Sequence, residues 1–111
     1  MEIESAEYKH CDLVKPHGRI DSATAPQLAK TLDDITNSGR YKIILDLADV
    51  DFMSSAGLRV LISTQKACKR YNRGEVVLTS VPKRIHDALD LAGFIPLFKF
   101  YDSALDAVGA M

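Results

Sequence analysis

The chain has 111 residues, of which 47% are hydrophobic and 26% are charged, the composition of an ordinary globular protein with room for one core. Its formal net charge is −1 and its basic residues are scattered, which argues against direct binding of nucleic acid. No apolar run reaches the roughly 18 residues of a membrane span, and the N-terminus lacks the features of a signal peptide. We expect a cytoplasmic protein that forms a single domain over residues 1–111, with a monomer favoured.

The first third of the chain predicts two strands and a helix. Residues 2–9 and 12–20 read as short strands, and Pro16 indicates an edge or a bulge in the second. A helix follows over residues 22–38, with Ser22 and Thr24 as candidate N-caps. Its predicted buried stripe, at helical spacing, is Ala25, Leu28, Leu32 and Ile35.

The rest of the chain alternates buried strands with amphipathic helices. The run Ile43-Ile44-Leu45 within residues 41–47 predicts a strand that is buried on both faces. The order predicted after it is a loop at 48–53, a helix from 54 to about 72 stopped by Gly74, a strand at 76–78, a helix from Pro82 to Gly93, a strand at 97–101 and a short helix capped by Ser103. This alternation predicts an α/β fold with helices packed against a sheet.

No pattern typical of catalysis or of cofactor binding occurs. The chain has no GxSxG, GxxxxGK[ST] or GxGxxG motif, so we do not expect an enzyme, and the sequence gives only weak support to nucleotide binding. The three histidines lack the spacing of metal ligands, and no metal site or other cofactor is predicted. Cys11 and Cys68 are predicted to be buried, reduced thiols.

Two adjacent serines stand where a buried strand leads into a helix. In open α/β sheets, ligands and partners are usually met at the carboxyl ends of the strands, and a helix start there favours an anion. One of Ser54 and Ser55 is expected to cap the helix, which leaves the other hydroxyl available as a phosphate acceptor. Gly57, in the first turn, fits either close packing against the sheet or access for a partner.

Three segments carry a resemblance to a known family. Residues 18–21 (GRID), 43–47 (IILDL) and 50–58 (VDFMSSAGL) resemble the STAS domain family, and within it the stand-alone bacterial anti-sigma factor antagonists. The resemblance extends over nearly the whole chain in the order of its elements. It implies a STAS-like fold with a mixed sheet of four or five strands and about four helices packed largely on one side.

The resemblance also implies a mechanism of transcriptional control. Such proteins bind an anti-sigma factor that is also a serine kinase. The anti-sigma factor then releases its sigma factor. The kinase phosphorylates the antagonist, which dissociates, and a serine phosphatase restores it. The acceptor position falls on Ser55, while Ser54 stands where the family has aspartate and stays an alternative acceptor.

The same resemblance points to a set of partner-binding residues around the acceptor. Asp21 is expected at the same edge, where it either caps the helix after it or binds the kinase, and Arg59 projects one turn from Ser55. The predicted set is Asp21, Thr24, Met53, Ser54, Ser55, Ala56, Gly57, Leu58 and Arg59.

Two other functions are compatible with a STAS domain. One is an accessory subunit of a lipid or anion transport system, and the other is a scaffold component of a signalling assembly. The retained serine, the near-neutral charge and the lack of an anchor favour the sigma-factor switch.

Overall fold

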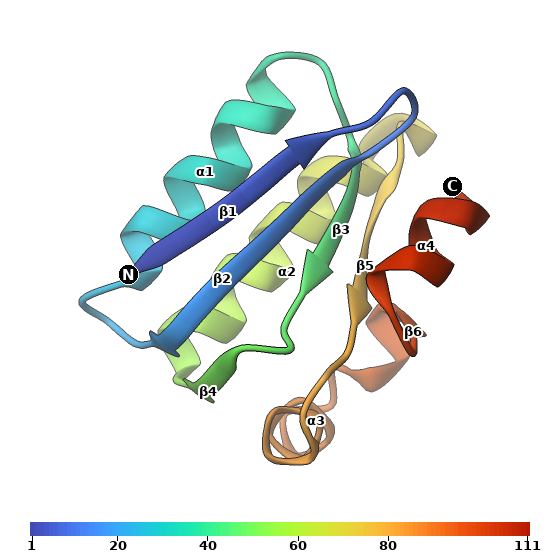
Figure 1. Ribbon diagram of the computed structural model, residues 1–111. Helices are drawn as coiled ribbons and strands as arrows, with labels where there is room; N and C mark the ends of the chain where they lie inside the picture. Colours follow the sequence, from blue (N-terminus) through green and yellow to red (C-terminus); the bar gives the residue numbers. More distant parts are fainter.

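The computed structural model describes all residues 1–111, as a mixed six-stranded sheet with four α-helices (Figure 1). The strands and α-helices are β1 (Glu2–Glu7), β2 (Asp12–Ile20), α1 (Ala25–Asn37), β3 (Lys42–Asp46), β4 (Val50–Met53), α2 (Ser55–Lys69), β5 (Glu75–Thr79), α3 (Lys83–Leu91), β6 (Lys99–Tyr101) and α4 (Ala104–Ala110). Two short 3₁₀ turns, Arg70–Asn72 and Ile95–Leu97, join α2 to β5 and α3 to β6.

The sheet has a continuous path of five strands in the order β1-β2-β3-β5-β6, while β4 pairs separately with β2. β1 and β2 form an antiparallel hairpin, and all the other pairings are parallel. The mixed α/β fold expected from the sequence is therefore confirmed. The path has five strands, within the four or five expected, and β4 adds a sixth.

β4 corrects the prediction of a loop at residues 48–53. Val50 and Met53 are buried, and they pair with Gly18 and Ile20 at the far end of β2. The exposed Asp51 between them belongs to the outward face of a strand. With only four residues and acidic neighbours, this strand carries too little alternation to be recognised from its own sequence, and its pairing with β2 decides its conformation.

The end of α2 also differs from the prediction. The helix stops at Lys69, and the chain then turns through Tyr71 and Asn72, both with positive φ. Contrary to the sequence prediction, Gly74 does not end the helix. A glycine is required there because a Cβ atom would lie 2.3 Å from the carbonyl oxygen of Tyr41. The glycine permits a close approach of two backbones at the start of β5.

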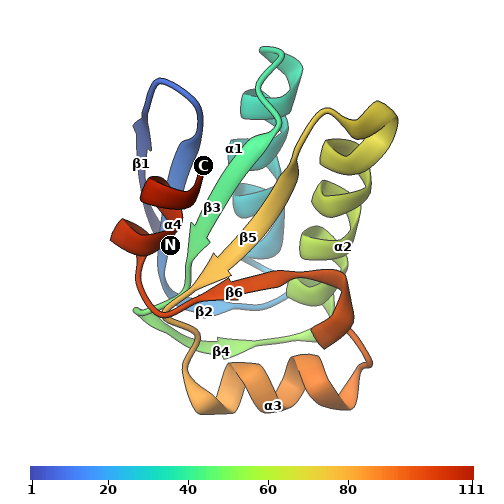
Figure 2. The same ribbon diagram turned by 90° about the vertical axis from the view of Figure 1, so that its right-hand side faces the viewer.

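The helices cover the sheet unequally (Figure 2). α1 and α2 pack side by side on one face, over a core cluster of 17 buried residues. α4 lies on the opposite face, where Ala107 packs with Ile44 and Val77. α3 lies across the end of the sheet against β4. The strand containing Ile44 is thus covered on both faces, as its uninterrupted apolar run predicted.

Both cysteines are free and buried, as expected. Burial raises the pKa of the Cys68 thiol to about 11, so this group stays protonated at neutral pH. None of the helices has the length and apolar character that crossing a bilayer requires.

Candidate partner-binding site

The candidate site lies where β2 and β4 end side by side. β2 leads through the turn at Asp21 into α1, and β4 leads through Ser54 into α2. The backbone N–H of Ser54 donates to the carbonyl oxygen of Ile20 at 2.8 Å, which ties the two strand ends together. Pairing between β2 and β4 therefore places the Asp21 turn beside the start of α2, although these residues are more than 30 positions apart in the sequence.

Ser54 and Ser55 have different roles at the start of α2. Ser54 is the N-cap residue, with extended backbone angles (φ −84°, ψ 175°), and its side chain accepts a hydrogen bond from the N–H of Gly57 at 3.5 Å. Ser55 is the first helical residue and is exposed, and its hydroxyl forms no hydrogen bond within the chain. Of the two hydroxyl groups, only that of Ser54 takes part in a hydrogen bond within the chain.

The start of α2 is electrostatically suited to an anion. No acidic residue lies in its first turn, so no carboxylate of that turn competes for the free backbone N–H groups there. The positive end of the helix dipole adds an attraction of about 0.3–1 kcal/mol for a negative group at an exposed position. A phosphate on Ser55 would lie close to these donors and would leave the helix intact.

Asp21 holds the turn that precedes α1. Its Oδ1 atom accepts hydrogen bonds from the N–H groups of Ala23 at 3.0 Å and Thr24 at 3.1 Å. These hydrogen bonds lower the pKa of the Asp21 carboxyl below its ordinary value of 3.8, and the bond from Ala23 has the larger effect. The other oxygen, Oδ2, lies 3.8 Å from Nε of Arg19 at the surface. The structure therefore shows Asp21 in its capping role, and its binding to a kinase stays a prediction.

We expect the lowered pKa of Asp21 to make the fold sensitive to acid. Because the folded pKa lies below 3.8, the stabilisation is fully present above that value and is lost as the pH falls through the folded pKa. An Asp21→Asn variant should therefore lose less stability than the wild type between pH 5 and pH 3. Urea unfolding at the two pH values measures this, with Asp34→Asn as a control. Equal pH dependence of wild type and Asp21→Asn would contradict the assignment.

Gly57 is explained by close packing. It is buried, and a Cβ atom at this position would lie 2.7 Å from Cγ2 of Ile20 and 2.8 Å from Cγ of Met53. Both distances are shorter than real Cβ atoms show, so one of the core side chains would have to move. The absence of a side chain here lets the first turn of α2 sit directly on the ends of β2 and β4.

A Gly57→Ala variant is expected to be less stable by about 1–2 kcal/mol. Overpacking costs about 1–3 kcal/mol, and the better helix propensity of alanine offsets up to about 1 kcal/mol of this. Urea unfolding measures the difference. Gly109, whose Cβ position in α4 is open, is the matched control, and Gly109→Ala should not destabilise the protein. A Gly57→Ala variant as stable as the wild type would refute this packing explanation.

The predicted partner-binding residues fall into three groups that differ in solvent exposure. Ser55 and Arg59 are exposed, whereas Met53 and Gly57 are buried and shape the site from beneath. The remaining members are half-buried: Asp21, Thr24, Ser54, Ala56 and Leu58. Thr24 occupies the N-cap position of α1, but its hydroxyl donates to the carbonyl oxygen of Arg19 and supports the Asp21 turn.

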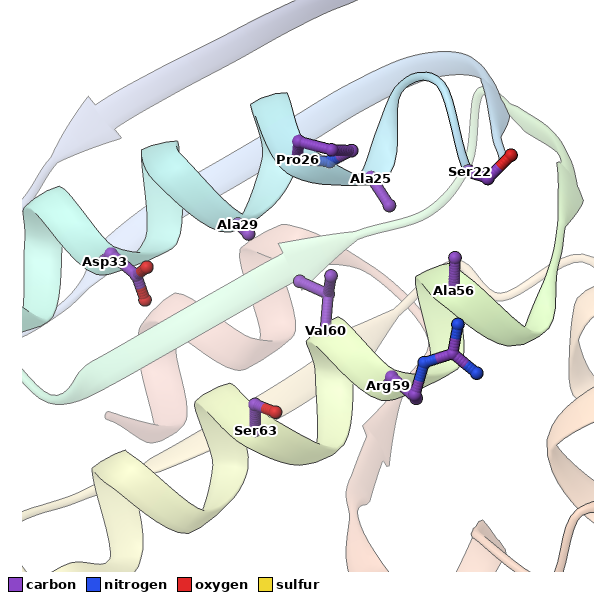
Figure 3. Close-up of a pocket in the computed structure, with 9 residues that line it drawn as sticks. All are labelled: Ser22, Ala25, Pro26, Ala29, Asp33, Ala56, Arg59, Val60 and Ser63. Atoms are coloured by element: carbon purple, nitrogen blue, oxygen red, sulfur yellow. The ribbon is translucent and has the colours of Figure 1, made fainter.

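The sequence prediction missed a groove that adjoins these residues. It has a volume of about 510 Å³ and runs between α1 and α2 from beside Ala56 toward Asp33 and Ser63 (Figure 3). Small side chains on the two facing helices leave it open, among them Ala25 and Ala29. Their helical spacing on α1 was visible in the sequence, but the facing of the two helices was not.

The comparisons with known proteins agree with this architecture. The STAS domain family matches residues 2–107. The "Putative anti-sigma factor antagonist BtrV" of Bordetella bronchiseptica is 32% identical over 93 residues, which cover 84% of this chain and 79% of that protein. The anti-sigma F factor antagonist of Paenibacillus polymyxa is 25% identical over 109 residues, covering 97% and 92%.

The fold is shared with a solved regulator. The phosphorylated form of the Bacillus cell fate determinant SpoIIAA superimposes with a TM-score of 0.78 at 13% identity, with 98% of each chain covered. Its mixed sheet brings the ends of β2 and β4, and with them the starts of α1 and α2, to one edge. The chain belongs to the STAS domain family.

Proposed function

We propose that this chain, acting as one module over residues 1–111, is an anti-sigma factor antagonist switched by phosphorylation of Ser55. In the unphosphorylated form it binds an anti-sigma factor that is also a serine kinase, and it releases that kinase once Ser55 carries a phosphate. A serine phosphatase resets the switch. The chain is then a substrate and a binding partner, not a catalyst. The two relatives described above carry antagonist names, which favours this function over a transport subunit or a scaffold.

The division of roles between the two serines is the observation that carries the proposal. Ser54 is used as the cap of α2, while Ser55 is exposed with a free hydroxyl. Aspartate and serine are equally good N-caps, so Ser54 keeps the structural role of the aspartate that the family has at this position. A phosphate on Ser55 leaves the hydrogen bond from the N–H of Gly57 to the Ser54 side chain in place.

Charge provides the physical basis of release. A phosphoserine carries nearly two negative charges at neutral pH and adds bulk at the centre of the contact surface. At 4 Å from an acidic group of the partner, repulsion reaches about 4 kcal/mol per charge pair for an effective dielectric constant of 20. Since about 1.4 kcal/mol changes an affinity tenfold, a fraction of this repulsion is enough for dissociation. No refolding of the antagonist is required.

Gel filtration with a candidate anti-sigma factor kinase, sought among the products of the neighbouring genes, tests the proposal. The complex should persist with ADP and dissociate with ATP. Ser55→Ala should form a complex that ATP does not dissociate, whereas the control Ser54→Ala should still be released. Release of Ser55→Ala by ATP at the wild-type rate would refute the switch.

A further inference from the structure

The groove between α1 and α2 continues the surface around Ser55. Its α2 side runs from Ala56, the residue after Ser55, to Ser63, a length of about 10 Å at 1.5 Å per residue, or two helical turns. Figure 3 shows the side chains of Ala29 on α1 and Val60 on α2 along its walls. An elongated occupant could therefore lie in the groove and reach Ser55 without any rearrangement of the fold.

Two charges of opposite sign mark the groove. Arg59 lies toward the Ser55 end and Asp33 toward the far end (Figure 3). Both are exposed, and neither has an ion-pair partner within the chain. The neighbouring Asp34, by contrast, pairs with Lys30 at 3.0 Å. The groove therefore offers one free cation and one free anion, a pattern that orients an occupant as well as attracting it.

We propose that this groove receives a helical segment, about two turns long, of the same kinase that Ser55 controls, with an acidic side chain facing Arg59 and a basic side chain facing Asp33. This inference rests on the proposed function, because it takes the partner at Ser55 as the occupant of the adjoining groove. A helix suits the groove better than a strand. The two flanking helices offer no free backbone groups with which a strand could pair, and small residues let a third helix approach closely.

Phosphorylation would act on the groove through Arg59. Ser55 and Arg59 are four positions apart on α2, the spacing at which side chains on a helix surface meet. A phosphate on Ser55 attracts this guanidinium more strongly than a carboxylate of the partner does, because it carries more charge and more acceptor oxygens. The kinase helix would thus lose its acidic anchor at the moment when repulsion begins at Ser55.

A charge reversal with a matched control tests the occupant. Asp33→Lys and Asp34→Lys alter the charge of the same helix equally, but only Asp33 lines the groove. In calorimetric titration of the ADP-bound kinase, Asp33→Lys should bind at least about tenfold more weakly than the wild type, and Asp34→Lys within about twofold of it. Equal affinities of the two variants would overturn the groove as a docking site. A wild-type chain that does not bind the kinase would overturn the proposed function and the occupant together.

A second variant blocks the groove without changing its charge. Ser63 is exposed at the end remote from Ser55, so a larger side chain there is tolerated by the fold. Ser63→Tyr should unfold at the wild-type urea concentration and bind the kinase about tenfold more weakly. Unchanged affinity in this folded variant would overturn the proposal, whatever the behaviour of Ser55.

Discussion

Ser55→Asp is expected to bind the kinase about 100-fold more weakly than the wild type, while Ser55→Ala binds at close to the wild-type affinity. The aspartate adds one negative charge to an exposed position where the wild type has a neutral hydroxyl. A hundredfold loss corresponds to about 2.8 kcal/mol, which is below the roughly 4 kcal/mol that a single charge pair at 4 Å supplies at an effective dielectric constant of 20. Calorimetric titration with the ADP-bound kinase measures both affinities.

Ser55→Asn is the matched control, because it has the size of the aspartate without its charge. Asparagine should weaken binding much less than aspartate if charge drives release. Raising the salt concentration should reduce the difference between the two variants, since screening weakens interactions between exposed charges. Equal losses for asparagine and aspartate would mean that bulk, not charge, releases the partner.

Gln65→Ala is expected to lower the free energy of unfolding by about 2–4 kcal/mol. The Gln65 side chain is buried and joins α2 to two other elements. Its Oε1 atom accepts from the N–H of Val76 at 2.7 Å, and its Nε2 atom donates to the carbonyl oxygen of Leu97 at 2.7 Å. Truncation creates a cavity and leaves the buried N–H of Val76 without its acceptor. The cavity and the unpaired N–H group each lower the stability of the fold.

Urea unfolding measures this loss, with Gln27→Ala as the control. Gln27 is exposed and donates to the carbonyl oxygen of Met1 at the surface, so its truncation should change stability by less than about 0.5 kcal/mol. If both variants were equally stable, the bridge from α2 to β5 would not contribute to the fold as described.

Much of the fold could be predicted because single segments carry enough pattern of their own. The run at Ile43–Leu45 is long and apolar enough to indicate a strand covered on both faces, and helices cover both. The end of α1 just before Gly39, a glycine with φ +91°, also follows from local sequence. β4 could not be predicted in this way, because pairing with β2 stabilises Val50–Met53.

The position of the site in the sequence was predictable, but the three-dimensional arrangement of its residues was not. Two adjacent serines before a helix left open which one was the cap, and the backbone at Ser54 settles that question of capping. The buried position of Gly57 likewise becomes clear only when Ile20 and Met53 are in place beneath it. The groove beside Arg59 depends on how two helices face each other, which no single segment encodes.

The central claim, that Ser55 is the residue on which the switch acts, is tested most directly by intact-mass analysis with peptide mapping. The chain would be incubated with ATP and the candidate anti-sigma factor kinase. The account predicts a single added phosphate, located on Ser55, and none on the Ser55→Ala variant. A phosphate on Ser54, or no phosphate while the chain binds a transport subunit, would contradict it.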